Sequence, residues 1–135
     1  MSKRLTKGEL DEMRTLGALN PVNYVVLALA SDAVAADAKA ALGAAGFSDE
    51  DILAYSSREL FPDLEAMLRK ASGAAGFGYE ITLMRRYMTL ASEGCGWLMV
   101  YSPDEAQTAK VQEVAKRFNA RSAVHYGRLA HQDLV

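Results

Sequence analysis

The sequence has 135 residues, of which 50% are hydrophobic and 24% are charged, and its formal net charge at pH 7 is −2. This length and composition predict a single globular domain that buries a core without disulfides or metal ions. The 15 basic residues are spread along the chain rather than gathered in one patch, which argues against nucleic acid as a partner.

Residues 1–21 are predicted to form an N-terminal helical extension. Thr6 and Glu9 have the Thr-x-x-Glu spacing of a capping box, apolar residues follow at helical intervals, and Gly17 ends the helix. Pro21 then marks the start of a single α+β domain, which we expect to occupy residues 22–135.

The first strand is predicted over residues 23–30, which form a short apolar run. Ser31 is expected to cap the helix that follows, whose alanine-rich stripe suits close packing on a sheet. The sequence GAAGF then ends this helix, with Gly43 and Gly46 as C-terminal stops. The second strand is predicted over residues 51–57.

A pair of helices is predicted as an insertion at about residues 57–93. Ser56 and Glu59 have capping-box spacing where the insertion begins. A second GAAGF, at residues 73–77, separates the two helices, and the second helix ends near Gly94. The residues around the two GAAGF copies do not match, so both copies are better explained as helix stops than as an internal repeat.

The third strand is predicted over residues 96–102, and another helix follows it. Ser102 is predicted to be the N-cap of that helix, with Pro103 in its first turn. Asn119 fits a left-handed stop at the end of the helix, and residues 121–126 are predicted to form the last strand.

The resulting order, β-α-β-(αα)-β-α-β, is that of the split βαβ unit of ferredoxin-like folds, with a helical insertion between the second and third strands. This topology places the first and third strands in the centre of the sheet. The second and fourth strands, which are shorter and more polar, are expected at its edges.

Both faces of the predicted sheet centre are apolar, because large apolar side chains alternate along the first and third strands. The helices of a plain ferredoxin-like domain cover only one face. The inserted helices, the N-terminal helix or another subunit must cover the second face. We expect a homodimer, because Tyr87 and Leu90 make the second inserted helix apolar on more than one side.

The cellular compartment is predicted from the single cysteine and from the lack of a long apolar segment. Cys95 favours a reducing compartment, and its place before an apolar run favours a buried, inert thiol over a reactive one. The N-terminus does not resemble a signal peptide. The longest apolar stretch, residues 25–30, is far shorter than the roughly 20 residues that span a bilayer. We therefore expect a cytoplasmic protein without stable membrane insertion.

The sequence carries no pattern that is typical of a catalytic, metal or cofactor site. A Gly-x-Ser-x-Gly motif is not present. His125 and His131 have no cysteine or acidic residue at metal-ligand spacing. The sequence GAAGFG follows a helix and has the wrong glycine spacing for a dinucleotide-binding loop. We expect neither a catalytic constellation nor a bound cofactor.

Two regions are candidates for ligand contacts. The helix that begins after the second GAAGF offers its N-terminus to an anion, and the arginines at 85 and 86 fit either a solvated edge or an anion or partner contact. A second region, around the final strand, fits an unfamiliar enzyme site. The candidate ligand-binding residues are Gly76, Gly78, Tyr79, Arg85, His125, Tyr126 and Arg128.

Two stretches of the chain, AADAKAALGAAGFSDEDI and GWLMVYSPDEAQTAKVQEVAKRFNARSAVHYGR, resemble the general-stress-protein-like (heat-induced stress protein) domains of bacteria. The similarity covers roughly residues 22–130. It lies in a helix that ends in Gly-Phe before an Asp-Ile strand, and in a late helix before an Ala-containing strand that ends in Tyr-Gly. The resemblance implies a stress-related role and no known catalytic residues.

Three hypotheses about function follow from the sequence. The first is a non-enzymatic, self-associating domain connected with stress responses. The second is a small-ligand sensor that holds an anion or metabolite near residues 76–79, by analogy with other ferredoxin-like regulatory domains. The third is an enzyme with a site around His125, Tyr126 and Arg128.

Overall fold

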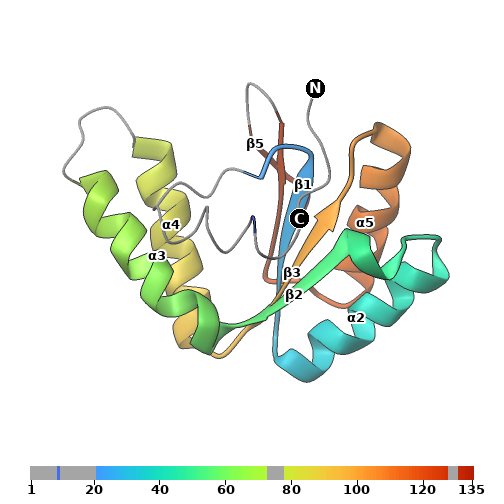
Figure 1. Ribbon diagram of the computed structural model, residues 1–135, viewed down its shortest axis with the longest axis horizontal. Coiled ribbons are helices and arrows are strands. Elements are labelled where there is room, and N and C mark those ends of the chain that lie inside the picture. Colours follow the sequence, from blue (N-terminus) through green and yellow to red (C-terminus); the bar gives the residue numbers. More distant parts are fainter. Residues whose placement is uncertain (1–8, 10–20, 73–77, 128–130) are drawn as a thin grey trace.

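The computed structural model describes residues 9, 21–72, 78–127 and 131–135. A five-stranded antiparallel sheet lies between two layers of helices (Figure 1). Its strands are β1 (Tyr24–Leu29), β2 (Ile52–Ser56), β3 (Gly96–Tyr101), β4 (Ser122–Tyr126) and β5 (His131–Asp133), in the spatial order β2-β3-β1-β4-β5. The helices are α2 (Asp32–Ala44), α3 (Ser57–Ser72), α4 (Gly78–Ser92) and α5 (Glu105–Arg117), with a short 3-10 turn at Asp49–Asp51.

The predicted α+β class is confirmed, as are the four predicted strands and the interior positions of β1 and β3. The prediction that β4 is an edge strand is wrong. β5 pairs with it, Tyr126 opposite His131 and Val124 opposite Asp133, so His131 lies in the sheet. β5 has only three residues and none of them is apolar, so it gives no strand signal in the sequence. The predicted N-terminal helix and the second GAAGF lie outside the described residues, apart from Glu9, which is helical.

Several predicted helix ends are confirmed. The Ser31 hydroxyl accepts a hydrogen bond from the backbone N–H of Val34 at 3.2 Å. Gly46 has a φ of 109°, and the N–H of Phe47 reaches back to the carbonyl of Leu42, which completes a Schellman motif at the end of α2. Gly43 lies inside α2, so its predicted role as a stop is wrong.

The other predicted helix ends also form. Ser56 and Glu59 make the reciprocal bonds of a capping box at the start of α3, because the Ser56 N–H donates to the Glu59 carboxylate and the Glu59 N–H donates to the Ser56 hydroxyl. At the other end of the chain, Asn119 has a φ of 54° and terminates α5, as predicted.

Ser102 is not the N-cap of α5, contrary to the prediction. The helix begins at Glu105, and the Asp104 carboxylate caps it by accepting a bond from the Gln107 N–H at 2.8 Å. Ser102 is fully buried, and its hydroxyl lies 2.7 Å from that of Thr108. The Ser-Pro-Asp-Glu sequence offers two capping side chains, and the serine is used for tertiary packing instead.

Replacing the true cap should weaken the protein measurably. Asp104→Ala is expected to lower the free energy of unfolding by about 1 kcal/mol, because the N–H of Gln107 loses its acceptor. Asp104→Asn should stay close to the parent, since asparagine caps as well as aspartate. Urea denaturation of the two variants measures the difference. If Asp104→Ala is as stable as the parent, the helix does not begin at this residue.

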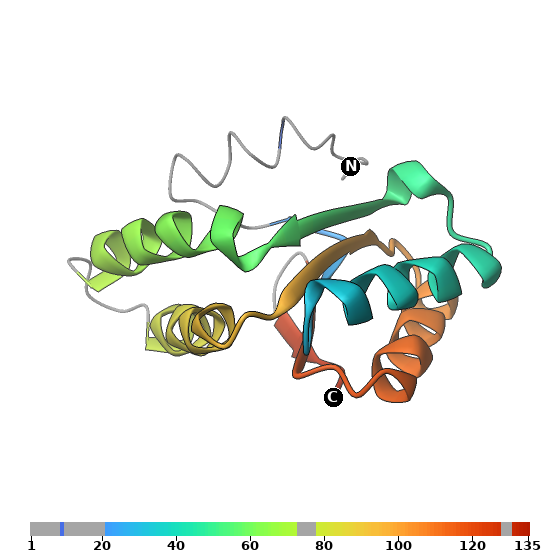
Figure 2. The ribbon, with the colours of Figure 1, turned by 90° about the horizontal axis from the view of Figure 1, so that it is seen from below.

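Both faces of the sheet are buried, each by its own pair of helices (Figures 1 and 2). Tyr24, Val26 and Ala28 of β1 belong to a cluster with α3 and α4, whereas Val25 and Leu27 belong to a cluster with α2 and α5. No residue of β1 is more than 1% exposed. The sheet is therefore the middle of three layers.

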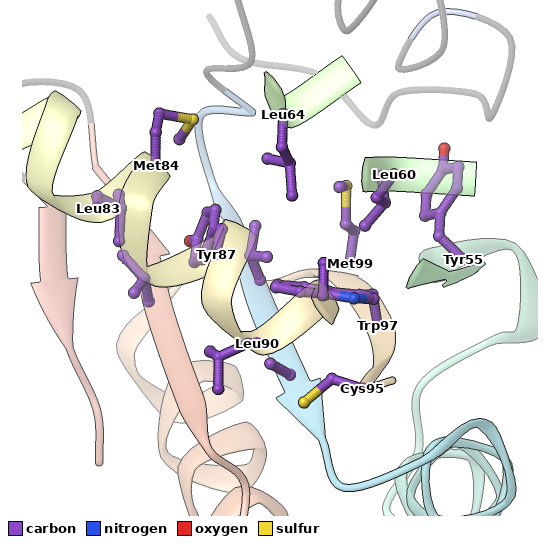
Figure 3. Close-up of a cluster of buried hydrophobic side chains, with 14 of the residues drawn as sticks. Tyr55, Leu60, Leu64, Leu83, Met84, Tyr87, Leu90, Cys95, Trp97 and Met99 are labelled. Atoms are coloured by element: carbon purple, nitrogen blue, oxygen red, sulfur yellow. The ribbon is translucent and has the colours of Figure 1, made fainter. Parts of the chain in front are cut away.

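The α3–α4 layer is fixed to the sheet by aromatic and polar contacts (Figure 3). The Tyr87 ring meets the Trp97 ring edge-on, with 5.3 Å between centroids. The Trp97 indole N–H donates to the Ser57 hydroxyl at 2.9 Å, and that hydroxyl donates to the carbonyl of Cys95. Leu90 of α4 belongs to the same buried cluster as Tyr87 and Trp97.

The premise of the homodimer prediction does not hold. Tyr87 is 1% exposed and Leu90 8% exposed within this single chain, so the second face of the sheet is covered by the chain's own insertion. Among the described residues, the one exposed large hydrophobic side chain is Val135. The oligomeric state itself stays a prediction, which sedimentation equilibrium can test.

Within the described residues, no helix combines the length and the apolar character needed to cross a lipid bilayer. The Cys95 side chain is 1% exposed. Desolvation by burial raises the pKa of its thiol, although the nearby positive charge of Arg121 acts in the opposite direction. A thiol that is buried and kept protonated is a poor nucleophile, so these observations support the inert reading of Cys95.

Candidate functional site

An open groove of about 630 Å³ lies where the first turns of α5 meet β4 and β5. We refer to it as the α5 groove. Six of its nine described lining residues have polar side chains, and the lining comes from three segments of the chain, residues 103–112, 125 and 132–134. The lining residues are Pro103, Asp104, Glu105, Thr108, Ala109, Gln112, His125, Gln132 and Leu134.

The pairing of β4 with β5 determines which side chains reach this groove. His125 lies directly opposite Gln132, and residues opposite each other in an antiparallel pair project to the same face. That face is the one covered by α5. Leu134, just after β5, donates its N–H to the Ala123 carbonyl at 2.8 Å and accepts a bond from the Gln112 side chain at 2.8 Å. The end of β5 is thereby tied to both β4 and α5.

The His125 ring is held in one orientation by the main chain. Its Nε2 lies 3.2 Å from the carbonyl oxygen of Ser102. A carbonyl only accepts, so Nε2 carries the proton and, in the neutral ring, Nδ1 is left as an acceptor. Ser102 is in turn fixed, because its N–H donates to the carbonyl of Asn23 at 2.7 Å. Asn23 has a φ of 70°, a conformation that asparagine tolerates better than most residues.

The hydroxyl groups beside the groove are bonded to one another rather than to the histidine. The Thr108 hydroxyl donates to the Asp104 carbonyl at 2.9 Å. Its single proton is used there, so the Ser102 hydroxyl must be the donor in the 2.7 Å contact between Ser102 and Thr108. An activated nucleophile needs a base within hydrogen-bonding distance. Among the described residues of the α5 groove, no hydrogen bond joins a hydroxyl group to the His125 ring.

The described lining of the groove is negatively charged. Asp104 and Glu105 contribute two carboxylates, and no lysine or arginine is among the lining residues in the part of the chain that the structure describes. Lys110, which lies further along α5 and is not a lining residue, donates a hydrogen bond to the Ala45 carbonyl at 3.5 Å. One oxygen of Asp104 caps the helix, and the carboxylate still presents its charge to the groove.

The predicted site residues are not gathered in one place. Of the seven, Gly76 and Arg128 lie outside the described residues, and the side chain of Tyr79 is not described. Gly78 begins α4, and Arg85 is exposed on that helix.

His125 and Tyr126 project to opposite faces of the sheet, as neighbours on a strand must. His125 lines the α5 groove, whereas the Tyr126 hydroxyl lies 3.0 Å from that of Tyr87 in the core beneath α4. A ligand in the groove therefore does not reach the Tyr126 side chain. An anion site at the start of α4 stays a prediction.

Sequence reasoning identified His125 but missed Asp104, Thr108 and Gln132 as groove residues. Asp104 and Thr108 were visible only as parts of a helix start. Gln132 becomes a neighbour of His125 through the β4–β5 pairing, for which the sequence gives no signal. Among the described residues, no group of three or more His, Cys, Asp or Glu side chains is placed to hold a metal ion.

Comparison of the chain with protein-family models, with curated proteins and with solved structures gives no significant match. The resemblance to general-stress-protein-like domains stays a prediction that rests on the quoted motifs.

Proposed function

We propose that this protein is a non-enzymatic binding domain that holds a small organic cation in the α5 groove. The observation that carries the proposal is the composition of the groove. Two carboxylates and a half-buried imidazole line one groove, and among the described lining residues there is no lysine or arginine. An amine-bearing molecule complements this arrangement, because its N–H groups donate and its charge is opposite.

Ligand binding by this site should be weak for small probes. Hydrogen bonds that involve a charged group contribute about 1.5–3 kcal/mol when they are shielded from water. Asp104 and Glu105 are exposed, so solvent screens part of that contribution. A diamine as small as putrescine is therefore expected to bind with a Kd of about millimolar.

The test uses three four-carbon probes that differ in charge: putrescine, butanediol and succinate. Calorimetric titration should show saturable binding of putrescine and none of butanediol or succinate. The double variant Asp104→Asn with Glu105→Gln should bind putrescine at least about tenfold more weakly, a change of about 1.4 kcal/mol. Because asparagine retains the helix cap, the variant should remain folded.

The control for this experiment is Glu113→Gln, which removes a carboxylate from an exposed position on α5 that does not line the groove. It should leave putrescine binding unchanged. Equal loss of binding in Glu113→Gln and in the double variant would mean that only the overall charge matters, and the proposed site would be wrong. Preferential binding of succinate would favour an anion site elsewhere.

We further propose that β1 to β4 form a ferredoxin-like sheet to which β5 is added, and that α3 and α4 are an insertion between its second and third strands. The order β2-β3-β1-β4 and the antiparallel pairing of these strands support this assignment. A cytoplasmic location and a stress-related role are carried as proposals on the sequence alone. No function is based on self-association, because the bare sheet face that motivated it is covered.

A further inference from the structure

β5 forms one wall of the α5 groove although it is only three residues long. A strand this short at the edge of a sheet makes few main-chain bonds, so its position depends on contacts beyond the ladder. On the groove side those contacts are the two bonds of Leu134 described above. On the opposite face a second contact is present, and it comes from the inserted helix α4.

The Arg86 guanidinium of α4 joins three elements. Its Nη2 donates to the Ser122 hydroxyl on β4 at 3.2 Å and to the Asp133 carboxylate on β5 at 3.2 Å. Asp133 projects to the α4 side because it pairs with Val124, a member of the cluster beneath α4, whereas Gln132 projects into the groove. One side chain on the far face of the sheet therefore holds the strand that forms the groove wall.

We propose that Arg86 is a positioning residue for the α5 groove, because it fixes β5 from the opposite face of the sheet. The expected effect of Arg86 on ligand binding rests on the proposed function, whereas the expected effect of Arg86 on the position of β5 does not. Both partners of the ion pair are about half exposed, so the pair contributes little to global stability. Its contribution is local, because it joins β5 to α4, beside the contact of the His131 ring of β5 with the Tyr126 ring of β4, whose centroids are 4.3 Å apart.

The chain supplies a matched control. Arg121 and Glu93 form a second exposed Arg–carboxylate contact at 3.4 Å, also between the α4 region and the sheet. That contact lies before β4 and does not involve β5. Loss of the Glu93 charge should therefore leave β5 unaffected, whereas loss of the Arg86 or Asp133 charge should not.

The experiment measures amide hydrogen exchange in the full chain for Arg86→Gln, Asp133→Asn, their combination and Glu93→Gln. The Leu134 amide, which donates to Ala123, should exchange about fivefold faster in Arg86→Gln and in Asp133→Asn. The combined variant should exchange no faster than either single variant, since both remove the same contact. The Leu27 amide at the centre of the sheet should be unchanged in all of them, which shows that the variants fold.

Putrescine binding to the same variants separates the two claims. The proposal expects a Kd that is several-fold higher for Arg86→Gln and for Asp133→Asn than for Glu93→Gln. If Leu134 exchange in Arg86→Gln equals that in Glu93→Gln, Arg86 does not hold β5 and the inference is overturned. Faster exchange with unchanged putrescine affinity also overturns the positioning role. If the parent binds no putrescine while exchange responds as expected, the proposed function fails and only the structural role of Arg86 stands.

Discussion

Gly96→Ala is expected to lower the free energy of unfolding by about 3 kcal/mol or more, at the top of the range for overpacked cores. Gly96 begins β3 where the start of α2 crosses it. A Cβ added there would lie 2.5 Å from the Ser31 carbonyl oxygen and 2.8 Å from the Asp32 Cα. Both are main-chain atoms, so the clash is relieved only if α2 shifts as a whole.

Gly43→Ala is the matched control, because Gly43 lies within α2 and a Cβ there meets nothing within 4 Å. It should raise stability by about 0.5–1 kcal/mol, the usual gain of alanine over glycine inside a helix. Urea denaturation with a common slope measures both changes. A Gly96→Ala variant as stable as the parent would show that α2 does not pack on β3 at this point.

Leu98→Ala and Met99→Ala should each lower the free energy of unfolding by about 2–5 kcal/mol. The two residues are neighbours on β3 and both are 0% exposed. Leu98 belongs to the cluster under α2 and α5, and Met99 to the cluster under α3 and α4. Equally large losses are expected because each truncation leaves a cavity in a different, fully packed layer.

The exposed Val135 provides the baseline, since Val135→Ala should change stability by no more than about 0.5 kcal/mol. A small effect of Met99→Ala beside a large effect of Leu98→Ala would contradict the three-layer arrangement. It would mean that the face toward α3 and α4 is not packed in solution, and the argument for a partner subunit would return.

The sequence predicted most of the sheet because its strongest signals are local. The apolar runs of β1 and β3 required burial on both faces, and the caps at Ser31, Ser56 and Asn119 fixed helix ends within a residue or two. The sequence did not predict which element covers the second face of the sheet. An apolar stripe such as that of α4 indicates that the helix packs against something, but it does not indicate which surface it packs against.

The candidate site was much harder to predict than the fold. His125 and Gln132 meet only because β5 pairs with β4, and β5 has neither the length nor the apolar alternation of a recognisable strand. The sequence predicted Ser102 rather than Asp104 as the N-cap, because both residues fit the capping pattern. In the structure the Ser102 hydroxyl bonds to that of Thr108 instead, and Asp104 caps the helix. The role of Arg86 depends on a contact across 47 positions of the chain, to Asp133, and no local pattern encodes it.

The most direct test of the proposed function is a two-dimensional amide NMR titration of the parent chain with putrescine. Binding in the α5 groove predicts saturable shifts at Thr108, His125 and Gln132, which line it from three segments. The shifts should be absent in the Asp104→Asn, Glu105→Gln variant. Saturable shifts confined to the start of α4 near Gly78, or no saturable shifts in the groove, would contradict the proposal.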